Sequence, residues 1–227
     1  MLNVIKTISD QRLKSYCPKG DFSDLPLVFA RYRKNILLCE SFYPSLHFLE
    51  ISLRNSIHTA ISASMGDHWL KNDKILRGTE VRKVQEAIQM LQDQRKPETV
   101  GGIIAELNLG FWVSLFDSYY DKLWNQKPRL KTVFPNLNAT ERTRVDISPR
   151  IQKIRKLRNR VFHYEPIWHW KDLSEQHDLL VEVIKWMSLD VRVLLDDLDR
   201  FHEVFKTPVL PITEDEFKQR LIDFQQK

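Results

Sequence analysis

The sequence contains few of the residues that mark several common protein classes. Only 6 of its 227 residues are glycine, which argues against a turn-rich β-sandwich or β-barrel and leaves room for long helices. The only two cysteines, Cys17 and Cys39, form no CxxC pair and no cluster with histidines at metal-ligand spacing. Neither a disulfide framework nor a structural zinc site is therefore indicated. We expect an all-α protein in a reducing compartment, with no metal and no cofactor.

Long hydrophobic runs are also missing. No run approaches the length of a membrane span, and Lys6, Asp10, Arg12 and Lys14 interrupt the N-terminal apolar residues where a signal peptide needs an unbroken stretch. We therefore expect a cytoplasmic protein with no membrane partner. The formal charge of +5 fits a polyanionic partner such as RNA, although many proteins without such a partner are equally basic.

Apolar residues recur at intervals of three and four, the period of an amphipathic helix, in several segments. This pattern predicts helices over about 27–42, 46–61, 81–91, 111–124, 148–163 and 179–198. Pro44 is expected to start or kink the second helix, Thr79 to cap the third, and Pro166 to stop the fifth. With 42% hydrophobic residues, the chain can bury a substantial core.

The C-terminal end has its own signals. Pro208 and Pro211 mark a linker, and Thr213 to Glu216 has the spacing of a capping box that opens a short helix. We expect residues 1–207 to form one helical domain, with residues 208–227 as a linker and a helix packed on the same domain.

The segment from Phe111 to Trp124 is the most aromatic part of the chain, with adjacent apolar pairs returning every four residues. Such a face can stack unpaired RNA bases. Its regular period and the large area of its side chains favour core packing instead.

Basic residues dominate the segment between Glu141 and Arg160, where eight Lys and Arg residues stand against two acidic ones. This stripe attracts phosphate, and Arg150, Lys153 and Arg155 are its candidate RNA-binding residues. The alternative is a solvated helix face, which is common on soluble proteins.

The stripe ends in Arg158-Asn159-Arg160-Val161-Phe162-His163. On a helix, Asn159 shares a face with His163, whereas Arg158 lies about 140° round from His163. A helix that loosens or ends before Pro166 brings all three together. Histidine transfers protons near neutral pH, and arginine offers a fixed fork of donors to phosphate. We interpret the three residues as a catalytic site that cleaves RNA without a metal ion, through an adjacent 2′-hydroxyl.

Glu50, Arg54 and His58 are spaced four apart and line one face of the second helix. Glu50 and Arg54 are at the spacing of an ordinary intrahelical ion pair. In the functional alternative, Glu50 orients a catalytic side chain and Arg54 holds phosphate. His58 is the next candidate for a second proton-transfer group.

Three blocks of the chain resemble the Abi-like abortive-infection proteins of bacteria, within the HEPN superfamily of helical RNA-cutting domains. They are residues 49–57 (LEISLRNSI), 110–124 (from GFWVSLF to LW) and 154–166 (IRKLRNRVFHYEP). The last block is similar to the superfamily signature of Arg, a polar residue, a short spacer and His.

The resemblance implies that Arg158 and His163 are the catalytic pair, that Asn159 is the polar auxiliary, and that a homodimer holds the active site at its interface. It also implies a role in phage defence or as a toxin, with an antitoxin or regulatory protein as a further partner. Some relatives carry a modified tyrosine two residues after the histidine. Here Glu165 occupies that position, and Tyr164 stands one place early.

The sequence thus predicts a metal-independent endoribonuclease. The alternative is a catalytically silent RNA-binding or protein-interaction HEPN module that uses the same basic helix. A DNA-binding regulator is disfavoured, because the sequence has no convincing helix-turn-helix pattern.

Overall fold

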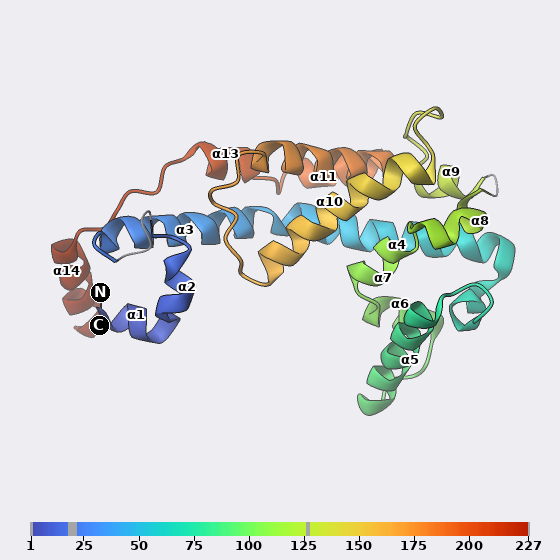
Figure 1. The fold of residues 1–227 in the computed structure, drawn as a ribbon, viewed down its shortest axis with the longest axis horizontal. Coiled ribbons are helices and arrows are strands. Elements are labelled where there is room, and N and C mark those ends of the chain that lie inside the picture. Colours follow the sequence, from blue (N-terminus) through green and yellow to red (C-terminus); the bar gives the residue numbers. More distant parts are fainter. Residues whose placement is uncertain (1, 18–21, 126–127, 227) are drawn as a thin grey trace. The chain divides into compact units, whose positions relative to one another are not determined.

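The computed structural model describes residues 2–17, 22–125 and 128–226. Within these ranges every regular element is a helix and none is a strand (Figure 1). The predicted all-α class is therefore confirmed. None of the helices in this part of the chain combines the length and the apolar character needed to cross a membrane.

The chain divides into two compact units. The terminal unit comprises the described residues of Met1–Tyr43, Asn159–Ser174 and Asp199–Lys227, and the central unit comprises Pro44–Arg158 and Glu175–Leu198.

The terminal unit contains α1 (Leu2–Ile8), α2 (Asp10–Lys14), α3 (Leu25–Ser41), α13 (Phe201–Lys206) and α14 (Glu214–Gln225). Asp24 begins α3 by accepting a hydrogen bond from the backbone N–H of Leu27 (3.0 Å). Lys34 of α3 donates to the backbone carbonyls of Phe205 (3.0 Å) and Thr207 (2.6 Å) at the end of α13. A lysine in this position satisfies carbonyls that a helix C-terminus leaves without partners.

The central unit contains most of the chain's helices. They are α4 (Tyr43–Met65), η1 (Asp67–Lys71), α5 (Gly78–Asp93), α6 (Val100–Glu106), α7 (Leu109–Ser114), η2 (Ser118–Tyr120), α8 (Asp121–Trp124), α9 (Arg129–Val133), α10 (Arg144–Phe162), α11 (Leu173–Met187) and α12 (Leu189–Asp196). Three of these helices have a few residues in the terminal unit: the first residue of α4, the last four of α10 and the first two of α11. The apolar stripe expected on α4 is fully buried, since Leu46, Leu49, Leu53, Ile57 and Ile61 are each at most 1% exposed.

Three sequence-based expectations need correction. Arg77, not Thr79, is the N-cap of α5, and the Thr79 hydroxyl donates to the Glu80 carboxylate instead. The apolar side chains of segment 111–124 are buried as expected, apart from the exposed Tyr119, but the segment is split into α7, η2 and α8. The predicted helix 179–198 is interrupted at Ser188, whose extended backbone and side-chain hydrogen bond to the N–H of Val191 start α12.

The signals near the C-terminus are confirmed in their local detail. Thr213 and Glu216 form the capping box that the spacing predicts, and α14 follows it. None of the described residues of α14 is buried.

Candidate functional site

The end of α10 has a defined backbone geometry that places His163. The N–H of Glu165 donates to the carbonyl of Arg160 (2.8 Å), and the N–H of Tyr164 donates to that of Val161 (3.2 Å). These two bonds form a Schellman motif in which His163 is the C-cap residue. Arg160 and Glu165 also form an ion pair at this point. The basic helix α10 therefore ends at Phe162, with His163 as its C-cap, because of hydrogen bonds within its own backbone. Tyr164, Glu165 and Pro166 follow outside the helix.

Tyr164 occupies the position of this motif that usually holds glycine. Its φ angle is +58°, and a left-handed conformation costs a residue with a Cβ roughly 1–2 kcal/mol. Arg12 compensates within the terminal unit, because it donates to the Tyr164 carbonyl and its guanidinium lies 5.9 Å from the centre of the tyrosine ring. A strained residue held by a specific partner is typical of functional sites.

The predicted catalytic residues His163 and Asn159 lie at the surface of the terminal unit. Both are exposed, and the N–H of His163 donates to the carbonyl of Asn159 (2.9 Å). The two residues are one helical turn apart, as the sequence predicts. An exposed imidazole on a fixed backbone can exchange protons with a bound substrate.

Arg158, the last residue of α10 in the central unit, is held by Glu50 of α4. The Nη2 atom of Arg158 lies 3.4 Å from Oε2 of Glu50, and each side chain is only about a quarter exposed (23% and 24%). The second carboxylate oxygen of Glu50 accepts from the N–H of Leu109 (3.1 Å), the first residue of α7. Glu50 thus links three helices and fixes the position of Arg158.

This arrangement replaces the intrahelical pair that the sequence spacing suggests. Glu50 pairs with Arg158 rather than with Arg54, because its two oxygens are directed toward α10 and α7. The alternative interpretation, in which Glu50 orients a candidate catalytic side chain, matches this geometry.

Arg54 and Arg155 carry charge that no acidic side chain of the described residues neutralises. Arg54 follows Glu50 by one turn of α4, and Arg155 precedes Arg158 by one turn of α10. Both are half-buried, with an enclosed Nε atom that has no hydrogen-bond partner in the described part of the chain. An anion near these side chains would offset the cost of keeping the charge partly buried.

The other basic-stripe candidates differ from each other. Arg150 has an acidic partner: its Nη2 pairs with Glu141 (3.1 Å) and its guanidinium lies over the ring of Trp186 at 5.2 Å, although its enclosed Nη1 has no hydrogen-bond partner among the described residues. Lys153 is exposed on α10. The structure therefore distinguishes residues that the sequence placed in one group.

His58 is held by a tryptophan. Its Nδ1 atom accepts from the indole N–H of Trp69 (3.1 Å), and the two rings are stacked 6.4 Å apart. Burial lowers the pKa of His58, while the charge of Asp67 opposes that shift. His58 is therefore favoured in its neutral form, with Nδ1 already engaged.

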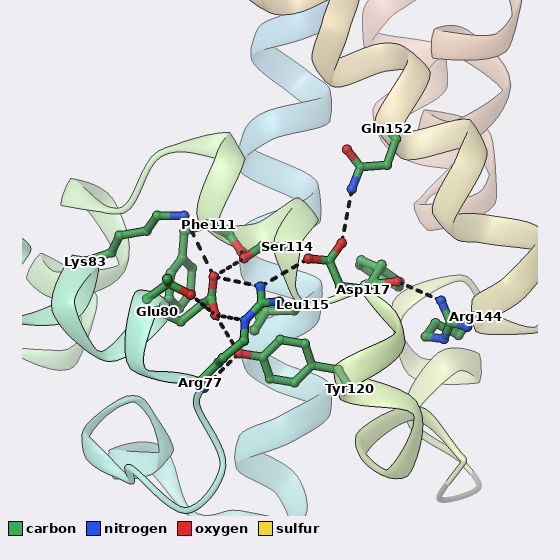
Figure 2. Close-up of polar contacts among 12 residues, drawn as sticks. Arg77, Glu80, Lys83, Phe111, Ser114, Leu115, Asp117, Tyr120, Arg144 and Gln152 are labelled. Atoms are coloured by element: carbon green, nitrogen blue, oxygen red, sulfur yellow. Dashed lines mark hydrogen bonds and ion pairs between the residues drawn. The ribbon is translucent and has the colours of Figure 1, made fainter.

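A second polar cluster in the central unit was not anticipated from the sequence (Figure 2). The Glu80 carboxylate is 1% exposed and accepts from Arg77 (Nε, 2.9 Å), Ser114 (3.0 Å) and Tyr120 (3.0 Å). Arg77 also reaches Asp117 (3.1 Å). This cluster joins α5 to the α7–η2 segment.

Glu80 stays ionised in this cluster. Burial by itself raises the pKa of its carboxyl, but the hydrogen bonds from Arg77, Thr79, Ser114 and Tyr120 outweigh burial and lower the pKa to about 2. The Arg77-x-x-Glu80 spacing is the one sequence signal for the cluster, because Ser114, Asp117 and Tyr120 lie more than thirty residues away along the chain. The hydrogen bonds are complete and internal, which is typical of a structural tie.

The class that these observations define is an all-α protein with an arginine-rich cluster on two helices and an exposed histidine at a fixed helix end. Comparisons of the chain with protein-family models, with curated proteins and with solved structures gave no match.

Proposed function

We propose that the protein is a metal-independent endoribonuclease of the Abi-like kind, within the HEPN superfamily. The observation that supports this proposal most is the Glu50–Arg158 pair, with the uncompensated Arg54 and Arg155 one turn away on the same two helices. This combination offers oriented and unneutralised positive charge to a phosphate backbone.

In the proposed reaction, the 2′-hydroxyl oxygen attacks the adjacent phosphorus, and the bond from phosphorus to the 5′-oxygen breaks. A base accepts the proton of the 2′-hydroxyl, and an acid returns a proton to the leaving oxygen, so the products are a 2′,3′-cyclic phosphate and a free 5′-hydroxyl. His163 supplies proton transfer, Arg158 stabilises the charge that develops on phosphate, and Asn159 donates a hydrogen bond.

The proposed partners are RNA and a second copy of the chain. One signature supplies a single histidine, whereas the reaction needs a base and an acid. A two-fold dimer that brings two copies of the signature together supplies both. We propose that such a dimer acts in the cytoplasm as a growth-arresting effector against phage, under the control of an antitoxin or other regulatory protein.

The test is to incubate the purified protein with a mixed RNA pool in the presence of EDTA. We expect cleavage by the wild type, loss of cleavage in His163→Ala, and unchanged cleavage in His169→Ala, an exposed histidine outside the signature. A single 2′-deoxy substitution at the cut site should block the reaction. Cleavage that needs a divalent ion, or that survives in His163→Ala, would refute the proposal.

A catalytically silent RNA-binding module is the second candidate. It is favoured by Arg54 and Arg155, because charge that no acidic side chain of the described residues neutralises can bind phosphate without any proton transfer by His163. RNA that binds to the wild type but stays intact in the same experiment would select this candidate.

A further inference from the structure

The terminal unit contains a pocket near the end of α10. The pocket has a volume of about 630 Å³, within the range of roughly 300–1,000 Å³ that is usual for small-ligand sites. Its apolar walls come from α3, the start of α4 and the end of α10: Tyr32, Ile36, Tyr43, Phe162 and Tyr164. Phe162 and Tyr164 are the two residues that flank His163 in the sequence.

The aromatic walls are exposed on a backbone that is fixed by hydrogen bonds. Tyr43 is 56% exposed, Phe162 is 38% exposed and Tyr164 is 72% exposed. The rings of Tyr43 and Phe162 lie 6.5 Å apart at an angle of 51°. Exposed aromatic side chains form platforms on which planar rings stack. All four RNA bases can stack on such a platform, because each has a planar aromatic face.

Two charged groups of opposite sign line the same pocket. Arg12 donates to the carbonyl of Tyr164, and Glu40 of α3 is 60% exposed and pairs with Arg200 at 3.5 Å. Guanine presents two acceptors, O6 and N7, on one edge, and two donors, N1–H and the 2-amino group, on the next. The donors of arginine match the two acceptors, and the oxygens of a carboxylate match the two donors. Cytosine does not present two adjacent acceptors beside two adjacent donors.

Cys39 lines the pocket without adding a reactive group. Burial raises the pKa of its thiol to about 11, against the lowering effect of the Arg12 charge. The thiol therefore stays protonated and contributes an apolar surface. This favours binding over covalent chemistry in the pocket.

We propose that this pocket binds one unpaired base of the RNA, with a preference for guanine, beside the phosphate that His163 acts on. The inference rests on the proposed function and adds its substrate class, which is single-stranded RNA with a guanine next to the cut. A base must leave its helical stack to enter such a pocket, so a duplex should be a poor substrate.

The experiment measures the binding of short oligomers of deoxyuridine that carry either one deoxyguanosine or one deoxycytidine. These probes lack the 2′-hydroxyl and stay intact. We expect the wild type to bind the guanine probe about ten-fold more tightly, and Tyr43→Ala to remove most of this difference, because a stacked base loses its platform. Tyr119→Ala is the matched control, since Tyr119 is also 56% exposed but lies outside the pocket.

Glu40→Gln provides a second variant that keeps the size of the side chain. It should lower the guanine preference without changing the binding of the cytosine probe, because only the charge that pairs with the guanine donors is removed. Equal binding of the two probes by the wild type, or an unchanged preference in both Tyr43→Ala and Glu40→Gln, would overturn the pocket assignment.

The two proposals can fail independently. A protein that cuts RNA but shows no guanine preference retains the nuclease function and loses the pocket assignment. A protein that binds the guanine probe through Tyr43 but leaves RNA intact loses the nuclease function and keeps a guanine-binding pocket.

Discussion

Glu50 lies 3.4 Å from the guanidinium of Arg158, although 108 residues separate them in the sequence. Because the second oxygen of Glu50 is held by the N–H of Leu109, the carboxylate has one orientation and Arg158 is fixed against it. Such a pair positions a charged group, whether or not it adds much to the stability of the fold.

The first prediction concerns this pair. Glu50→Gln keeps an oxygen for the N–H of Leu109 but removes the charge that orients Arg158. We expect RNA cleavage to fall about ten-fold, which corresponds to ~1.4 kcal/mol of transition-state stabilisation. Initial-rate measurements of kcat and KM test this. Glu86→Gln is the control, because Glu86 forms an exposed pair with Arg82 on α5; equal rates in the two variants would contradict an orienting role for Glu50.

The second prediction separates the basic residues by their partners. Replacing Arg54 and Arg155 with Gln should flatten the salt dependence of RNA binding by about 1.4 in the log–log slope, since each phosphate contact on a single strand contributes roughly 0.7. Arg150→Gln should leave the slope almost unchanged, because Arg150 is already paired with Glu141. Binding titrations over a range of salt concentrations measure the slopes. A larger change in Arg150→Gln than in the double variant would show that the ion pairs do not determine the contacts.

Much of the fold follows from the sequence where the pattern is local. The stripe from Leu46 to Ile61 is periodic and becomes the buried face of α4, and the Thr213 capping box forms as its spacing predicts. The sequence was misleading where a polar side chain ends a helix inside a regular apolar pattern. Ser188 lies within such a pattern, yet its hydroxyl caps a new helix.

The candidate site shows the same division. The turn between Asn159 and His163 is local and was predictable, whereas the partner of Arg158 was not, because the i, i+4 spacing of Glu50 and Arg54 gave an equally reasonable local alternative. The positive φ of Tyr164 also had no sequence signal, since tyrosine rarely adopts it. It depends on Arg12, which is distant in the sequence.

The third prediction concerns the buried carboxylate of Glu80. Its pKa is lowered to about 2 from an ordinary value of 4.5, so the ionised form stabilises the folded state on the order of 3 kcal/mol above pH 5. This contribution should decrease as the pH falls from about 5 toward 2. Urea unfolding of wild type and Glu80→Gln should therefore show a difference that is largest near neutral pH and shrinks in acid.

Glu86→Gln, on the same helix but exposed, is again the control and should change the free energy of unfolding by no more than about 0.5 kcal/mol. A difference between wild type and Glu80→Gln that stays constant from neutral pH to pH 3 would show that the carboxylate is not the group responsible.

The fourth prediction tests whether the active site is shared. If the reaction uses one His163 from each of two chains as base and acid, dilution below the dissociation constant of the dimer should lower the activity per chain. Excess His163→Ala protein should also inhibit the wild type, because mixed dimers carry one histidine and lack the second proton-transfer group. His169→Ala protein, added in the same excess, should not inhibit. Sedimentation of the same samples reports the oligomeric state. A monomer with full activity per chain at every concentration would exclude a shared site. His58, already favoured in its neutral form, would then be the next residue to substitute.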